Sequence, residues 1–367
     1  MLEKIFFPWM DRPRFPIVQG GMGAGISLLP LASAVADADA ICTLSSVALD
    51  QFTSARVGEK LNQVEAVVRE VSDTKKAGGF AAINVMVKLV GSYRQSIEGA
   101  VKGGANMIVS GAGLPTNLPE LVEQFAGTKN HNIALVPIVS SADVLDILIN
   151  RYWMKQGHLP DAVVLEGPKA GGHIGFSYKT IKRSGANFLN DYDLFDVLLD
   201  PVLEVASRYS IPVFVAGGIR THENIEYALR RGAAGVQIGS PFVATPESGA
   251  SDHFKQVLID SHNEDVLLGD ETWGSPALYP FRYLRGSPLF SKKLGKYFCI
   301  CSALFSSTTT AIPQKEGVCP EEYVKPLKGN CPARGNVLYN GLYTSGTEIN
   351  TITRIRPAAD IIRELVG

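Results

Sequence analysis

One histidine stands in a glycine-rich segment that directly follows an apolar run. The segment Glu166–Gly175 reads EGPKAGGHIG, in which Gly171 and Gly172 precede His173. An imidazole titrates near neutral pH and can transfer a proton or donate a hydrogen bond. The two glycines leave room beside it for a planar ligand and a substrate. We therefore predict that His173 lies on an exposed loop beyond a strand and is catalytic, whereas an isolated histidine is more often structural.

Two later glycine loops have the composition of a phosphate-binding site. Ala216–Ile219 reads AGGI and Ile238–Ser240 reads IGS, and each follows an apolar run. Glycines at the end of a strand let a ligand approach the backbone, whose N–H groups bind phosphate without a lysine or arginine. Plain turns are the alternative interpretation. A dinucleotide fold is disfavoured, because Gly21-x-Gly23-x-Gly25 lacks the G-x-G-x-x-G spacing.

Other kinds of catalytic site are poorly supported. Four of the five cysteines lie close together near the C-terminus, but their spacing lacks the paired C-x2-C knuckles of a zinc or iron–sulfur site. We interpret them as free thiols and predict no metal site. Neither a G-x-S-x-G elbow nor a pair of carboxylates stands out. These four cysteines are Cys299, Cys301, Cys319 and Cys331. We assign no catalytic role to the other histidines, which are His131, His158, His222, His253 and His262.

Short apolar runs alternate with helical patterns over most of the chain, which is typical of parallel βαβ units. Helices are predicted over Asp143–Trp153 and Glu223–Arg231, the second with Thr221 as its N-cap and Gly232 at its end. Eight strands favour an α/β fold of the (β/α)8 or TIM-barrel type over an open doubly wound sheet. The strands begin near Ile17, Ile41, Gly79, Met107, Ile133, Ala162, Pro212 and Ala234.

The alternation of apolar runs with helical patterns becomes weaker after about residue 245. We predict a barrel over residues 1–245 and a smaller, partly helical C-terminal subdomain over residues 246–367, packed on the barrel as a cap. Its last element is an amphipathic helix over Ala358–Val366. The long polar stretch 297–335 is expected to cover part of the molecule, because such stretches are uncommon in compact domains.

The composition excludes several classes of partner. The 367 residues include 35 basic and 36 acidic side chains, and the net charge of −1 gives no field that would attract nucleic acid. The uncharged run Phe15–Ala36 could in principle cross a membrane, but its glycines and prolines divide it into a strand, a turn and a helix start. With five cysteines and no secretory leader, we expect a cytoplasmic protein.

Six motifs, in order along the chain, resemble those of the nitronate monooxygenase family, formerly called 2-nitropropane dioxygenases, and of the related FMN-dependent enoyl-ACP reductases. A looser similarity continues at SPALYPFR (275–282) and NGLYTSGTE (340–348). The six are FPIVQGGMG (15–23), INVM (83–86), GAGLP (111–115), EGPKAGGHIG (166–175), VFVAGGI (213–219) and GVQIGSPF (235–242).

The resemblance implies a TIM barrel that holds FMN without a covalent bond. His173 falls on the family's active-site histidine, beside the flavin on the substrate side. Gly21 and Met22 would lie along the isoalloxazine edge, Asn84 would hydrogen-bond the flavin, and Glu166 and Gly171 would contact the ribityl side. The phosphate would be held by Gly217, Gly218, Gln237, Ile238, Gly239 and Ser240.

The implied activity is oxidation of alkyl nitronates with O2 to a carbonyl compound and nitrite. An NAD(P)H-dependent enoyl-ACP or quinone reductase is the alternative, and a non-enzymatic flavin-binding barrel is a third option. Lys169 stands where the family usually has Glu, and QGGM and HIG lean toward the reductases. We expect a small-molecule substrate and leave the oligomeric state open, with a homodimer as one option.

Overall fold

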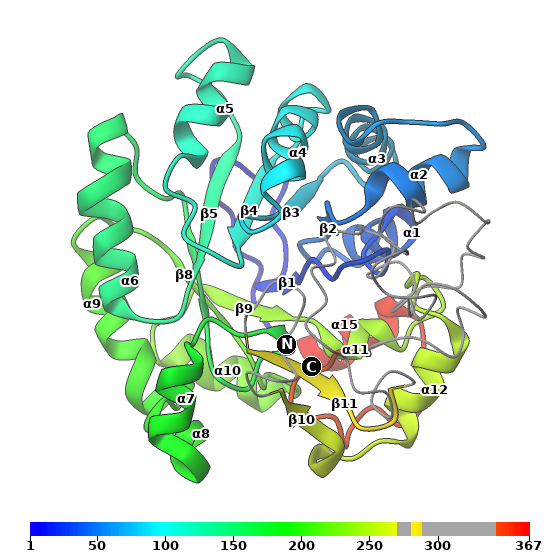
Figure 1. The fold of residues 1–367 in the computed structure, drawn as a ribbon, viewed down its shortest axis with the longest axis vertical. Coiled ribbons are helices and arrows are strands. Elements are labelled where there is room, and N and C mark those ends of the chain that lie inside the picture. Colours follow the sequence, from blue (N-terminus) through cyan, green and yellow to red (C-terminus); the bar gives the residue numbers. More distant parts are fainter. Residues whose placement is uncertain (270–279, 288–342) are drawn as a thin grey trace, which may run out of the picture.

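The computed structural model describes residues 1–269, 280–287 and 343–367 of the chain. Within these residues, eight parallel strands form one sheet in the order β1-β9-β8-β6-β5-β4-β3-β2 (Figure 1). All eight predicted strands are confirmed. Their bounds are β1 Ile17–Gln19, β2 Thr43–Ser45, β3 Ala82–Met86, β4 Met107–Gly111, β5 Ala134–Val139, β6 Val163–Glu166, β8 Val213–Ala216 and β9 Gly235–Ile238.

The sheet is closed into a nearly complete barrel between its first and last strands. Val18 of β1 forms a parallel bridge with Ile41, just before β2. Ile41 N–H donates to Ile17 O at 2.9 Å, and Gln19 N–H donates to Ile41 O at 2.8 Å. The predicted TIM-like barrel is therefore confirmed, and the carboxyl ends of all eight strands open on one face.

Helices surround the barrel because each strand is buried on both faces and needs an apolar cover. Every residue of β1, β4 and β8 is buried, for example. The helices around the barrel are α1 Leu29–Asp37, α2 Leu49–Val57, α3 Gln63–Gly78, α4 Val90–Lys102, α5 Leu118–Ala126, α6 Ala142–Ile147, α9 Asp200–Ser207 and α10 His222–Arg230. Shorter helices α7 Tyr178–Ser184, α8 Phe188–Asp191 and α11 Ser240–Val243 lie in the loops that follow β6 and β9.

The two helices predicted by residue range are both present. Thr221 caps α10 through a reciprocal pair of hydrogen bonds with Asn224, as its residue type indicated. The helix predicted over Asp143–Trp153 begins as α6 and continues over Leu148–Trp153 with wider, π-helical turns. Trp153 is fully buried at its end, and its Nε1–H donates to Pro115 O at 2.9 Å.

A small antiparallel sheet corrects one prediction about His173. The sheet contains β10 (Val266–Leu268), β11 (Phe281–Leu284) and β7 (Gly172–His173), in the order β10-β11-β7. His173 was expected on an exposed loop, but it is half-buried in a two-residue strand whose partner is Phe281. That pairing depends on a residue far along the chain, which no local pattern around His173 reveals.

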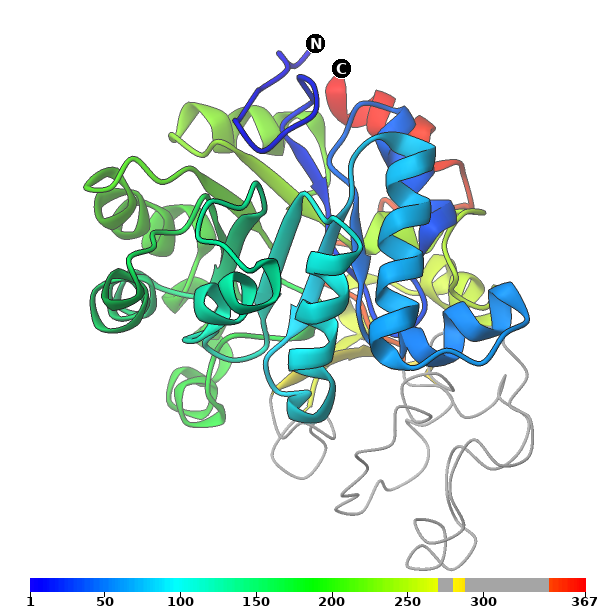
Figure 2. The same ribbon diagram turned by 90° about the horizontal axis from the view of Figure 1, so that it is seen from above.

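The elements after residue 245 pack against the barrel in the described residues. Helix α12 (Asp252–Asp260) carries Phe254, whose ring stacks on Tyr343 at 4.5 Å between centroids. The predicted final helix is confirmed as α15 (Ala358–Val366), which contacts α1, α10 and α11. Leu2 N–H donates to Val366 O at 2.9 Å, so the two ends of the chain lie together (Figures 1 and 2). The boundary near residue 245 stays a prediction.

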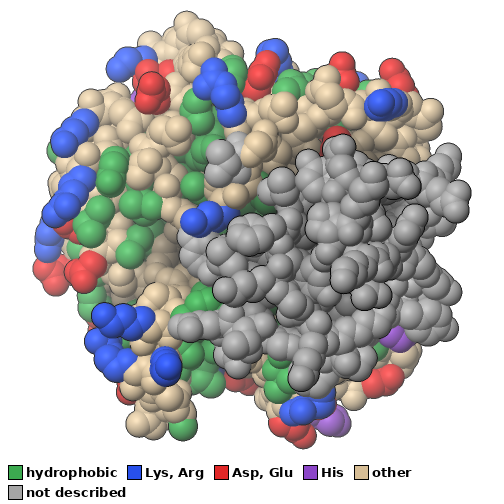
Figure 3. Space-filling view, in the orientation of Figure 1, with side chains coloured by type: hydrophobic (Ala, Val, Ile, Leu, Met, Phe, Trp, Pro, Cys, Tyr) green, Lys and Arg blue, Asp and Glu red, His purple; other side chains and the backbone are tan. Residues whose placement is uncertain are grey.

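The uncharged run near the N-terminus divides as predicted into strand β1, a glycine-containing turn and helix α1. Among the described residues, no helix has the length and apolar character needed to cross a membrane. Acidic and basic side chains are both spread around the face drawn in Figure 3. This distribution agrees with the near-zero net charge of the chain. The polar stretch 297–335 and the four C-terminal cysteines lie outside the described residues.

Candidate active site

The residues predicted to act in catalysis or cofactor binding all lie on the carboxyl face of the barrel. All but Asn84 belong to the last two residues of a strand or to the segment that follows it, and Asn84 is the middle residue of β3. Strand ends of a barrel meet at one face, where most enzymes of this fold place their chemistry. They are Gly21 and Met22 after β1, Asn84 in β3, Glu166 in β6, Gly171 and His173 after β6, Gly217 and Gly218 after β8, and Gln237, Ile238, Gly239 and Ser240 in and after β9.

The ends of β1, β3 and β9 meet in one corner of this face. A Cβ atom at Gly21 would lie 2.5 Å from Asn84 Cβ, and one at Gly239 would lie 3.6 Å from Met22 Sδ. The absence of a side chain at Gly21 is therefore required by the barrel's own packing. Gly239 has no such close neighbour among the described residues, so a ligand can approach its backbone. Ile238 differs, because its side chain is buried in the barrel core and only its backbone can reach this face.

The loops after β6 and β8 lie next to this corner, because β8 pairs with β9. Gly217 and Gly218 have φ values of 102° and 86°, which side-chain-bearing residues rarely adopt. A Cβ atom at Gly217 would lie 3.0 Å from Ala170 N, and one at Gly218 would lie 2.9 Å from Lys169 Cδ. These two glycines thus serve both the backbone conformation and the close contact between the two loops.

The C-terminal segment 343–348 lies across these loops. Gly346 N–H donates to Ser240 Oγ at 3.0 Å, and Thr347 N–H donates to Lys169 O at 3.1 Å. A Cβ atom at Gly171 would lie 2.5 Å from Gly346 N, so the glycine permits this crossing. The segment was not among the predicted site residues. The sequence feature that could have identified it is the looser similarity of NGLYTSGTE (340–348) to the family.

Lys169 has a partner in the same segment. Its Nζ lies 3.0 Å from Glu348 Oε1, and both side chains are partly exposed. Arg220, just beyond the β8 loop, donates through Nε to Glu348 O. The basic residue that replaces the expected Glu is thus neutralised by an acidic residue of the C-terminal segment, and it fastens that segment to the β6 loop.

Several buried polar atoms near these loops lack a hydrogen-bond partner among the described residues. They are Thr43 Oγ1, Gln237 Oε1, Ser345 Oγ and Thr347 Oγ1. Gln237 lies beside Gly20, and Ser345 and Thr347 flank Gly346. Buried polar groups are nearly always satisfied in native proteins, although four further unpartnered atoms lie in other parts of the described chain. Their grouping here indicates a polar ligand on this face.

His173 is held in a desolvated setting. Its ring packs edge-on against Phe281, with centroids 4.8 Å apart and planes at 70°. Burial lowers the pKa of His173 to about 4, so the imidazole is neutral at pH 7. A neutral imidazole can donate a hydrogen bond to an anion, but with this pKa it is a weak base. Phe281 belongs to the other segment of looser similarity, SPALYPFR (275–282), of which residues 280–282 are described.

Glu166, at the end of β6, is the second titratable group on this face with a strongly shifted pKa. Its carboxyl ends β6 and is half-buried. Burial raises the pKa of Glu166 to about 8, so at pH 7 the group is mainly protonated. A protonated carboxyl can donate a hydrogen bond and adds no negative charge to the site. Among the described residues, no group of His, Cys, Asp and Glu side chains could hold a metal ion.

A family model described as nitronate monooxygenase matches residues 10–367. The chain belongs to the nitronate monooxygenase family. It is therefore an oxidoreductase of that family, as the six motifs predicted. The match includes both the barrel and the C-terminal segment that lies across its loops.

Two proteins named as probable nitronate monooxygenases are similar to parts of the chain. A probable nitronate monooxygenase of Staphylococcus haemolyticus is 24% identical over 289 residues, which cover 72% of this chain and 74% of that protein. A probable nitronate monooxygenase of Bacillus subtilis is 35% identical over 108 residues, covering 29% of this chain and 28% of that one.

Solved structures of differently named proteins have the same fold. FabK from Thermotoga maritima has a TM-score of 0.65 and 22% identity, covering 95% of this chain and 91% of its own. A nitroalkane oxidase from Streptomyces ansochromogenes has a TM-score of 0.64 and 18% identity, covering 95% and 94%. At these identities the likeness extends to the fold alone.

The Lys169–Glu348 ion pair gives a test of how the C-terminal segment is held. Lys169→Glu or Glu348→Lys would place like charges together and should each lower the free energy of unfolding by up to about 1 kcal/mol, because exposed pairs contribute roughly 0.2–1 kcal/mol. The double reversal should recover most of the loss. Urea unfolding of the four proteins measures the coupling, and hydrogen exchange at Thr347 locates it. Additive losses without recovery would show that the pair does not fasten the segment.

Proposed function

We propose that the chain is an FMN-dependent enzyme that oxidises alkyl nitronates with O2 to a carbonyl compound and nitrite. The observation that carries the proposal is the position of a neutral, desolvated His173 on the carboxyl face of a nitronate monooxygenase-family barrel. The glycine loops after β8 and β9 lie on that same face. A small-molecule substrate follows from this activity.

The residues around the carboxyl face fit FMN. Gly217, Gly218 and Gly239 would present their backbone to a phosphate. The hydroxyls of Ser345 and Thr347 lack partners among the described residues beside the loop of Ser240. In this proposal, the backbone N–H groups of these loops hold the phosphate without a lysine. Gly21, Met22 and Asn84 would lie along the ring of the cofactor, and Glu166 and Gly171 would lie along its ribityl chain. Gln237, Ile238 and Ser240 would complete the phosphate site. When bound, FMN would supply the electron-transfer chemistry of the reaction.

The pKa of His173 bears on the form of the substrate. With a pKa of about 4, the imidazole is a poor acceptor for the proton of a neutral nitroalkane. It can donate a hydrogen bond to a nitronate oxygen, which is already anionic. Glu166, whose pKa is raised to about 8, stays neutral at pH 7 and does not repel that anion. We therefore propose preformed nitronates as the substrate class, ahead of neutral nitroalkanes.

A reductase is the second candidate. QGGM at residues 19–22 and HIG at 173–175 are the motif variants that lean toward the enoyl-ACP or quinone reductases. Such an enzyme would take electrons from NAD(P)H and pass them to an enoyl thioester or a quinone. Ile174 is buried beside His173 and therefore does not itself contact a substrate.

Anaerobic mixing of the flavin-loaded protein with a nitronate and, separately, with NADH or NADPH distinguishes the candidates. We expect the nitronate to bleach the flavin spectrum and nitrite to be released when oxygen is admitted. Rapid bleaching by a reduced nicotinamide, with no oxygen-dependent nitrite from the nitronate, would favour the reductase. If neither donor reduces the flavin, the barrel only binds it.

His173→Ala should retain FMN but lower kcat/KM for a nitronate by roughly 10²-fold. This is the usual effect of removing one hydrogen-bond donor that stabilises negative charge during a reaction. His173→Asn keeps a donor and should retain more of the activity. His262→Ala, at an exposed histidine far along the chain, serves as the control. Unchanged kinetics in His173→Ala would remove this residue from the mechanism.

Gly218→Asp should expel FMN, since the new carboxylate would oppose the phosphate and the side chain would meet Lys169. Gly58→Asp is the matched control, because Gly58 has a similar φ of 73° and no atom within 4 Å of an added Cβ. The flavin content of the purified proteins is measured by absorbance after release. A fully loaded Gly218→Asp protein would show that the phosphate lies elsewhere.

A further inference from the structure

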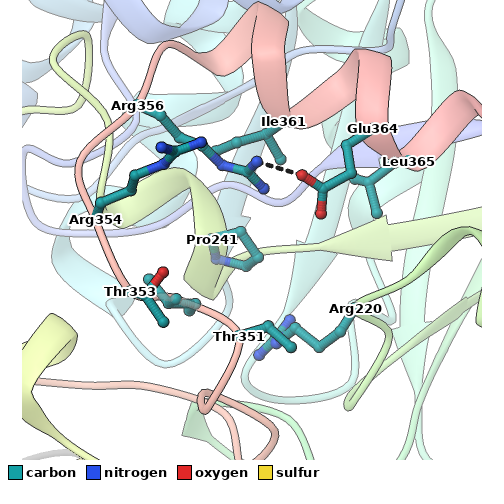
Figure 4. Close-up of a pocket in the computed structure, with 10 residues that line it drawn as sticks. Arg220, Pro241, Thr351, Thr353, Arg354, Arg356, Ile361, Glu364 and Leu365 are labelled. Atoms are coloured by element: carbon teal, nitrogen blue, oxygen red, sulfur yellow. Dashed lines mark hydrogen bonds and ion pairs between the residues drawn. The ribbon is translucent and has the colours of Figure 1, made fainter.

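A cavity lies between the C-terminal segment and the loops that follow β8 and β9 (Figure 4). Its volume is about 270 Å³, which is near the lower end for pockets that bind small molecules. On the barrel side it is bounded by Arg220 and Pro241, and on the other side by residues 351–356 and α15. None of the residues that we assign to FMN or to the nitronate lines it.

The lining of the cavity carries an excess of positive charge. Three guanidinium groups, from Arg220, Arg354 and Arg356, face one carboxylate, from Glu364. Arg356 is ion-paired with Glu364, as the dashed line in Figure 4 marks. The pairing leaves two guanidinium groups, those of Arg220 and Arg354, for an anion from outside.

Arg220 is a half-buried cation whose charge is not directly paired. Its Nε donates to Glu348 O and its Nη1 donates to Ile219 O at 2.8 Å, but both acceptors are neutral carbonyls. Within the described residues, its Nη2 donates to no acceptor. Burial lowers the pKa of Arg220 only to about 10, so the group is charged at neutral pH. The carboxylate of Glu348 is close enough to raise the pKa of Arg220 in part, but it forms its ion pair with Lys169. Desolvating a charge that has no ion-paired carboxylate of its own is unfavourable, and an anion in the cavity would relieve this cost.

Arg354 and two threonines complete the polar part of the lining. Arg354 is exposed and forms no hydrogen bond or ion pair with the described part of the chain. Thr351 and Thr353 are exposed on the same segment and line the cavity with it. Pro241, together with buried side chains of α15, supplies an apolar wall. Guanidinium groups match phosphate geometrically, and hydroxyls can donate to its remaining oxygens.

We propose that this cavity binds the phosphate group of a small phosphomonoester, with Arg220 and Arg354 on the dianion and the organic part against the apolar wall. The excess of two positive charges matches a dianion, and the volume suits a small metabolite better than a whole dinucleotide. The site is separate from the proposed FMN phosphate loops, although Arg220 follows one of them in sequence.

Calorimetric titration of the flavin-loaded protein with inorganic phosphate, ribose 5-phosphate and ribose, at constant ionic strength, tests the proposal. We expect both phosphates to bind and ribose not to bind. Arg354→Ala should weaken the binding of both by roughly tenfold or more, because hydrogen bonds to charged groups are among the stronger ones. Arg151→Ala removes an exposed arginine from the π-helical turns after α6 and should change nothing.

Glu364→Gln should change the affinity for phosphate in the opposite direction to Arg354→Ala. It removes the one carboxylate of the cavity, so phosphate should bind more tightly than to the unaltered protein. Absence of binding, equal weakening by Arg354→Ala and Arg151→Ala, or binding of inorganic phosphate but not of ribose 5-phosphate would each overturn the proposal. So would phosphate binding that occurs only in flavin-free protein and is abolished by FMN, because the ligand would then occupy the cofactor loops.

Discussion

The closure of the parallel sheet between β1 and β2 is the constraint on which the rest of the structure depends. β1 and β2 are the two edge strands in the order of the sheet, and the bridge between Val18 and Ile41 joins them. As a result, β1 lies beside β9 on one side and near β2 on the other. This closure places Gly21 against Asn84 and Met22 beside Gly239. In an open sheet the ends of β1 and β3 would not share one corner of a common face with β9.

The second determinant is the C-terminal segment that returns to this face. Gly346 bonds to the hydroxyl of Ser240, and Glu348 pairs with Lys169. The segment therefore contacts the loops after β6 and β9, and Glu348 also lies beside Gly218 of the β8 loop. The same return creates the arginine-lined cavity on its outer side. The molecule thus needs both its barrel and its last residues to form a complete site.

Local sequence pattern was sufficient for the barrel but not for the electrostatics of the site. Apolar runs and caps such as Thr221 act over a few residues, and these predictions were confirmed. The pairing of His173 with Phe281 and of Lys169 with Glu348 depends on residues distant in sequence, 179 positions apart for the ion pair. Because burial follows from such contacts, the low pKa of His173 could not be predicted from its neighbours. The assignment of cofactor residues remains a prediction.

The most direct test of the account is the absorption spectrum of the purified protein, with identification of any flavin that is released on denaturation. The account predicts flavin bands and the release of FMN in a ratio near one per chain, because the glycine loops after β8 and β9 are proposed to hold a single phosphate. A colourless protein that does not take up added FMN would contradict it. Release of a flavin without a phosphate would contradict the assignment of those loops.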